Sequence, residues 1–189
     1  MKMLTQEETK QKNKLLLLLA LNASMFFIEM VAGWINNSAG LMADGLDMLA
    51  DAVVYGLAVY AVGRTIISKN RAAKFAGLVE LSLAALAFGR VAYQIRLNLM
   101  PEAQPMILIA LLALAVNITC LLLLRSEQEK GSHMKASYIF SANDVLANLG
   151  LIIAGVLVAQ LNSPIPDWII GFLIGVLAVS GAIRIMRLK

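Results

Sequence analysis

The sequence predicts an all-α membrane protein, a six-helix transmembrane bundle with its N- and C-termini in the cytoplasm. Of its 189 residues, 60% are hydrophobic and 15% are charged, whereas a soluble domain is about 45–50% apolar and about 25% charged. The apolar residues gather into six runs, each near the ~20 residues that a helix needs to cross a bilayer. Lys and Arg gather on one side of these runs.

Composition also excludes several classes of protein. A soluble enzyme and a disordered regulator do not carry this much apolar sequence. A disulfide scaffold is excluded because the chain has one cysteine, Cys120, which has no partner for an internal disulfide. The net charge of +4 is interpreted as positive charge on one membrane face. We therefore expect membrane lipid as a partner and no nucleic acid.

The predicted spans divide nearly the whole chain. They cover residues 15–35, 39–63, 73–95, 106–124, 136–161 and 164–183. Residues 1–14 are expected to be a cytoplasmic N-terminal segment and residues 15–186 the transmembrane domain, with no C-terminal cytoplasmic domain. All the prolines fall at the ends of spans, where a missing N–H costs little.

The orientation follows from the basic residues. Of the 16 Lys and Arg residues, all but Arg90 and Arg96 precede the first span, follow the sixth, or lie between spans two and three or four and five. Cytoplasmic segments carry the excess of Lys and Arg, so both termini are placed in the cytoplasm. The expected location is the plasma membrane, or the inner membrane if the source is a bacterium.

Half of the 12 acidic residues lie inside predicted spans and away from the loop at residues 162–167, and a charged side chain inside a span costs at least ~2.5–3.5 kcal/mol. Asp44, Asp47 and Asp51 share one stripe of the second span. Three like charges on one stripe repel, so protons or a cation must neutralise them. Oxygen ligands suit a divalent cation. The alternative is that some of these aspartates are protonated and hydrogen-bonded between helices.

The fifth span carries a second polar group. Asp144 and Asn148 are four residues apart and share a face, while Asn143 lies ~100° round the helix. These side chains are candidates to complete the site begun by the second span, although the amides are also typical of interhelical hydrogen bonds. Glu29 and Glu80, in the first and third spans, are candidates for the ion's approach or for helix packing.

At these residues the chain resembles the cation diffusion facilitator family. The resemblance runs from Leu21-Asn22 through Glu29, Gly33 and Ser38 to the Leu-x-Ala-Asp-x-x-Asp-x-x-x-Asp segment that ends at Asp51. It resumes at Lys74 and Glu80, and again from Asn143-Asp144 to Gly150. The resemblance covers essentially the whole chain and implies a dimer of six-helix membrane domains. It also implies export of a divalent metal ion from the cytoplasm in exchange for protons, and no enzymatic activity.

The resemblance assigns metal ligands residue by residue. Asp47 and Asp51 match the family pair on helix two, and Asp144 matches the second ligand on helix five. The first ligand on helix five, usually His or Asp, falls on Phe140, which cannot bind a metal. Asn143 is the first candidate to replace it and Asn148 the second, with water or Ser141 after them. Asp44 is expected to orient Asp47.

The identity of the metal is open at this point. The resemblance favours zinc, but the predicted spans contain no His, and an all-oxygen site suits manganese, iron or cobalt as well, with cadmium also considered. Two alternative functions remain, a non-transporting membrane subunit and a metal sensor with the same fold. The acidic stripe argues against both, because a scaffold has no use for it.

Overall fold

The computed structural model describes the backbone of residues 5–61, 66–125 and 132–187, and the side chains of residues 5–60, 74–125, 141–184 and 186–187. This part of the chain forms six α-helices. They are α1 (Gln6–Ile35), α2 (Ala39–Ala61), α3 (Ile66–Leu97), α4 (Ala103–Arg125), α5 (Ser132–Leu161) and α6 (Ile165–Met186). The predicted six-helix, all-α architecture is confirmed for these residues.

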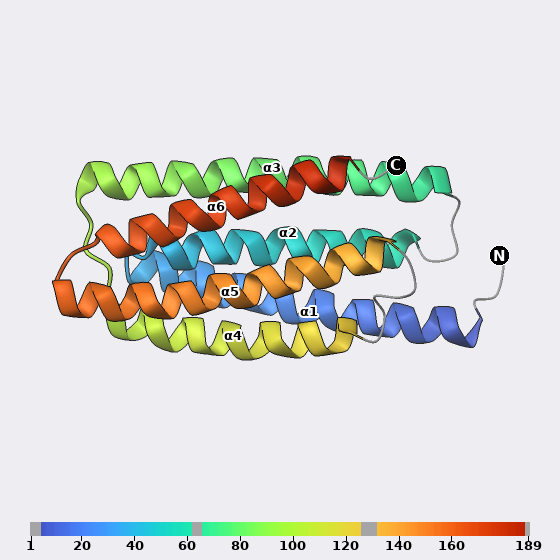
Figure 1. Ribbon diagram of the computed structural model, residues 1–189, viewed down its shortest axis with the longest axis horizontal. Helices are drawn as coiled ribbons and strands as arrows, with labels where there is room; N and C mark the ends of the chain where they lie inside the picture. The colour runs from blue at the N-terminus through green and yellow to red at the C-terminus, as the bar shows by residue number, and fades with distance from the viewer. Residues whose placement is uncertain (1–4, 62–65, 126–131, 188–189) are drawn as a thin grey trace.

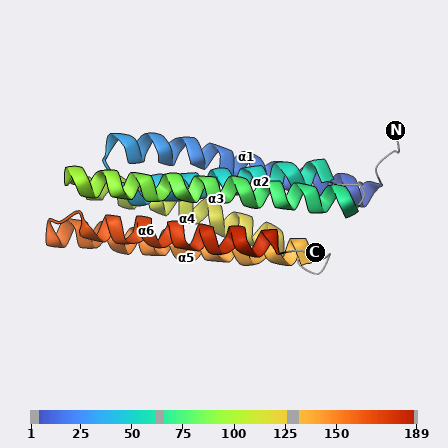
Figure 2. The ribbon, with the colours of Figure 1, turned by 90° about the horizontal axis from the view of Figure 1, so that it is seen from above.

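The helices run lengthwise side by side, and the two chain termini lie at the same end of the bundle (Figure 1). Seen from above, α1 lies on one side and α5 and α6 on the other (Figure 2). Helix α2 contacts every other helix, most extensively α1 and α3. The residues of α2 that are least compatible with lipid therefore lie where five neighbours can shield them.

Five of the helices are long and apolar enough to cross a membrane, by length and composition. Helix α2 is also long enough, at 23 residues, but it carries the three aspartates. Large apolar side chains cover the outside of the bundle, among them Phe27, Leu86 and Ile153. Such a surface would associate in water, whereas in a bilayer it faces lipid tails.

Helices α1, α3 and α5 begin before their predicted spans, on the Lys-rich side. Helix α1 begins at Gln6 rather than at residue 15, so much of the expected N-terminal segment is helical. Its start is fixed by a capping box: the Thr5 hydroxyl accepts from the Glu8 N–H at 3.2 Å, and the Glu8 carboxylate accepts from the Thr5 N–H at 2.8 Å. Hydropathy does not detect such polar turns, because they project out of the apolar run.

At the opposite end, Asp167 of α6 caps the start of α2. Its carboxylate accepts hydrogen bonds from the Ser38 hydroxyl at 2.7 Å and from the Ala39 and Gly40 N–H groups at 2.6 and 3.0 Å. A carboxylate at a helix N-terminus also interacts favourably with the helix dipole. Gly171 lies against the backbone of Ala39, where an added Cβ would be 3.1 Å from the carbonyl carbon. This joint holds α6 against α2.

We expect Asp167→Ala to destabilise the protein, because it leaves buried donors at the start of α2 without an acceptor. The loss of charge-assisted bonds is expected to cost about 2–4 kcal/mol, which corresponds to a melting temperature lower by roughly 5–12 °C. Thermal unfolding in detergent measures it. Asp167→Asn keeps an acceptor oxygen and is expected to lose less, and the exposed Glu102→Gln serves as control. Equal melting of Asp167→Ala and wild type would contradict the capping role.

Candidate metal centre

The three aspartates of α2 each lie near a carboxyl group of a different helix. Glu29 of α1 interacts most strongly with Asp44, and Asp144 of α5 interacts most strongly with Asp51. Glu80 of α3 interacts most strongly with Asp47. The centre of the bundle therefore holds six carboxyl groups arranged as three facing pairs, which we call the α1, α3 and α5 pairs.

Basic residues do not balance these charges. For the six carboxyl groups, the strongest electrostatic neighbours in the described part of the chain are one another. Arg90 lies within a predicted span, but its guanidinium sits over the rings of Trp34 and Tyr93, 5.3 and 5.4 Å from their centroids. The negative charge at the centre is thus left for protons or a bound cation to neutralise.

The α1 pair is the most deeply enclosed. Glu29 is 0% exposed, and neither of its carboxyl oxygens has a hydrogen-bond partner among the described residues. Gly45 makes room for it, since a Cβ there would lie 3.2 Å from the Glu29 Cβ. Two oxygens that are buried without partners are costly, so this position favours a proton or a transient ligand.

The α5 pair joins α2 to α5. The carboxyl groups of Asp51 and Asp144 lie close enough to interact strongly, and two facing carboxylates repel each other unless a proton or a cation neutralises them. Tyr55, which is 2% exposed, lies beside Asp51, and its hydroxyl is available as a hydrogen-bond donor there. Sequence reasoning missed Tyr55, although a polar aromatic residue four positions after Asp51 lies on the same face of the helix.

The amides predicted to join the site differ in their surroundings. Asn148 is buried beside Asp44, and its Nδ2 donates to the Asp144 carbonyl at 2.9 Å. Its Oδ1 is buried without a partner among the described residues, so this oxygen is free to accept or to bind a cation. Asn143 is half-buried, and the described contacts include none between Asn143 and the carboxylates. The side chain of Phe140 lies outside the described residues.

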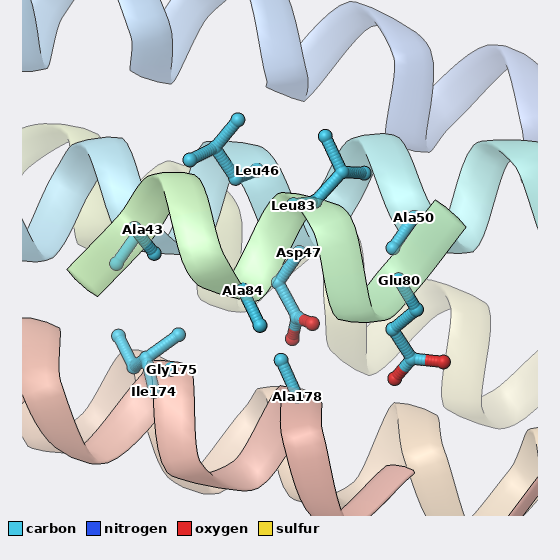
Figure 3. Close-up of a pocket in the computed structure, with 11 residues that line it drawn as sticks. Ala43, Leu46, Asp47, Ala50, Glu80, Leu83, Ala84, Ile174, Gly175 and Ala178 are labelled. Carbon is cyan, nitrogen blue, oxygen red and sulfur yellow. The ribbon is translucent and has the colours of Figure 1, made fainter. Parts of the chain in front are cut away.

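The α3 pair lines a small pocket between α2, α3 and α6. Figure 3 shows the carboxyl groups of Asp47 and Glu80 pointing to the same side, toward α6 near Ala178. The other side chains of this lining are apolar, and the free volume is about 10 Å³. That volume is at the lower limit for one water molecule. Asp51 and Asp144 are not part of this lining.

The predicted ligands are thus brought together only in part. Within the described part of the chain, no three acidic, His or Cys side chains lie close enough to hold one metal ion. Asp47 lines the pocket with Glu80, whereas Asp51 lies beside Asp144. Asp47 also interacts with Asp51 and Asp144, but the three carboxyl groups do not close on one point. An ion bound by all three would require these side chains to move toward one another.

Fold and centre together define a multi-pass helical membrane protein with an acidic interior. Comparison with known proteins adds the family: residues 15–188 match the cation efflux transmembrane domain, and the chain belongs to this family. The resemblance to cation diffusion facilitators is therefore confirmed. The family transports cations, so the chain is not an enzyme, and we assign it to the plasma membrane.

Curated relatives carry the name zinc transporter ZitB. The proteins of Yersinia pestis and Escherichia coli (strain K12) are each 25% identical over 193 residues, covering 95% of this chain and 62% of their own length. The protein of Pectobacterium atrosepticum has the same identity, with 60% of its own length covered. This chain spans about three fifths of the length of these relatives.

Proposed function

We propose that this protein exports divalent metal ions from the cytoplasm in exchange for protons, through the carboxyl groups around α2. The observation that carries the proposal is the arrangement of three facing pairs in a membrane interior. Membership of the cation efflux family supports it. A scaffold or subunit with no transport role has no need of six enclosed carboxyl groups, each of which is costly to insert.

We assign Asp47, Asp51 and Asp144 as the carboxylate ligands of the transported ion. Asn148 is the better supported amide ligand because its buried Oδ1 is unpartnered, and Asn143 is the second. Zinc is proposed as the main substrate because the relatives are named zinc transporters. An oxygen-rich site also suits Mn²⁺, Fe²⁺ and Co²⁺, and Cd²⁺ is included among the ions to test.

The proposed mechanism links metal binding to proton release. A cation that enters between Asp51 and Asp144 takes the place of any proton that neutralises this facing pair, because a metal ligand must be deprotonated. Glu29, Asp44 and Glu80 then serve as the pathway or as proton carriers. Access alternates when the bundle opens to the cytoplasm with metal bound and to the other side with protons bound. All six helices, α2 included, span the membrane in this proposal, with both termini in the cytoplasm.

Reconstitution tests the function directly. The protein is placed in liposomes that hold a zinc indicator and a pH indicator, and Zn²⁺ is added outside with and without a proton gradient. We expect Zn²⁺ entry accompanied by proton exit, and faster entry when the lumen is acidic. Zinc entry that is indifferent to the gradient would remove the antiport step, and no metal flux for any of the five ions would remove the transport proposal.

The family resemblance also leads us to propose a homodimer within the lipid bilayer. The wide apolar outer surface offers helix faces for such a contact. Native mass spectrometry of the protein released from detergent micelles measures the subunit number. A dimer that persists on dilution is the expected result, and a monomer at all concentrations would contradict it.

Tyr55→Phe is expected to weaken zinc binding roughly 10- to 100-fold, the usual effect of removing a partner that orients a metal ligand. The variant deletes only the hydroxyl, which is available to donate to Asp51, and keeps the buried ring. Calorimetric titration with Zn²⁺ measures the affinity. Tyr93→Phe is a matched control, because Tyr93 is exposed and its contact with Arg90 is made by the ring. Equal affinity in Tyr55→Phe and wild type would show that the hydroxyl does not position Asp51.

A further inference from the structure

We propose that Asp47 and Glu80 form a second binding position for a divalent cation, in the pocket between α2, α3 and α6. This position shares Asp47 with the ligand set proposed above but is completed by Glu80, and Asp51 and Asp144 lie outside its lining and form the other position. The inference rests on the proposed function in that the cation is the transported one. The inference adds a second binding position along the path of the ion. It makes Glu80 a direct ligand of that ion rather than a packing residue or a remote acid.

The burial and direction of the Glu80 side chain are the first observations that support this position. Glu80 is 6% exposed, and its Oε2 has no hydrogen-bond partner among the described residues. Figure 3 shows its carboxyl group beside that of Asp47, both directed toward α6. A carboxyl oxygen buried without a donor is costly, so the pair needs a positive partner.

The residues that line the pocket limit which positively charged partner it can hold. Apart from the two carboxyl groups, the pocket is lined by side chains that offer no N–H or O–H donor: Ala43, Leu46, Ala50, Leu83, Ala84, Ala87, Ile174, Gly175 and Ala178. The free volume of about 10 Å³ admits one particle the size of a water molecule and no organic cation. Two carboxylates around so small a space suit a small divalent ion that accepts low coordination numbers.

The separation from the other pair follows from helix geometry. Asp47 and Asp51 are four residues apart, so Asp47 points about 40° away from Asp51 around α2. This rotation turns Asp47 toward α3 and α6, while Asp51 faces α5. The positions lie one helical turn apart along α2, which is a short step for an ion passed from one pair to the next.

The test is a titration of the purified full chain in detergent with Zn²⁺ alone, in which calorimetry gives the number of ions bound. We expect two ions for wild type and for Glu102→Gln, an exposed control with the same substitution. Glu80→Gln is expected to lose one ion and keep the other. Asp144→Asn is expected to lose the other ion and keep the Glu80 position. Each variant is first checked for an unchanged helical circular dichroism spectrum.

A second variant guards against an indirect effect of Glu80→Gln. Ala178→Val adds bulk to the pocket without altering a carboxyl group, and it is expected to lose the same ion as Glu80→Gln. The inference is overturned if Glu80→Gln binds as wild type does, or if wild type binds a single ion. Full binding by Asp144→Asn together with loss in Glu80→Gln would instead remove the proposed Asp51–Asp144 site and leave this one standing.

Discussion

Asp51→Asn is expected to reduce metal transport at least roughly 100-fold, since removing even a residue that only orients a ligand costs about 10- to 100-fold. The variant keeps the shape of the side chain and removes its charge. Asp51 is the α2 residue that faces Asp144, so the variant breaks the contact between the two helices from which the resemblance draws its ligands. Zinc uptake into liposomes measures the rate.

Three further variants test whether the effect is specific to this pair. Asp144→Asn is expected to match Asp51→Asn, because the two carboxyl groups act as one pair. The double variant is expected to lose no more than either single variant, as residues that act together are not additive. Glu102→Gln, which is exposed and lies outside the bundle centre, is the control for removing a carboxyl charge. Transport at the normal rate by either single variant would exclude the pair as the transport site.

In the same variants, the melting temperature is not expected to fall together with the transport rate. Asn in place of Asp51 can donate to Asp144 with no proton required, and it removes one of two facing carboxyl groups. The melting temperature of Asp51→Asn is therefore expected to equal or exceed that of wild type. A folding defect would lower both quantities together, so the two measurements separate loss of function from loss of structure.

The sequence predicts the helices well because their signal is local. Apolar runs and the clustering of Lys and Arg depend on neighbouring residues only, and the structure has six helices in the expected places. The predicted ends of the helices are less accurate. Helix α1 starts at a capping box that no hydropathy pattern contains, and α3 begins at Ile66 rather than at residue 73.

From the sequence alone, only the positions of the three aspartates on α2 can be predicted for the candidate centre. A period of 3.6 residues places Asp44 and Asp51 within about 20° of each other and Asp47 to one side. The sequence does not contain the packing that sets α1, α3 and α5 opposite these three residues. Glu80 therefore entered as a pathway residue, and its contact with Asp47 emerges only from the tertiary structure.

Two other residues were missed for the same reason. Asp167 falls at the polar start of the sixth span, where exposure next to a loop is the simplest interpretation, yet its carboxylate accepts hydrogen bonds from the first N–H groups of α2. Tyr55 lies in an apolar run, where a tyrosine usually fills space with its ring. Its role beside Asp51 depends on the burial that α1, α2 and α4 provide together.

Phe140→His is expected to increase zinc affinity by roughly tenfold or more and to leave Mn²⁺ affinity nearly unchanged, because imidazole nitrogen suits zinc better than manganese. Residue 140 lies four positions before Asp144 in α5, and residues four apart share a helix face. The family resemblance places a ligand there. Competition titrations with Zn²⁺ and Mn²⁺ measure both affinities.

Phe75→His is the matched control, since Phe75 is exposed on α3 and a histidine there is expected to change neither affinity. A gain in zinc affinity confined to Phe140→His would place the bound ion beside Asp144 on α5. It would also mean that phenylalanine at this position tunes the natural site toward harder ions. Unchanged zinc affinity in Phe140→His would move the ion away from this face of α5, and the Asp47–Glu80 position would then be the stronger candidate for the main site.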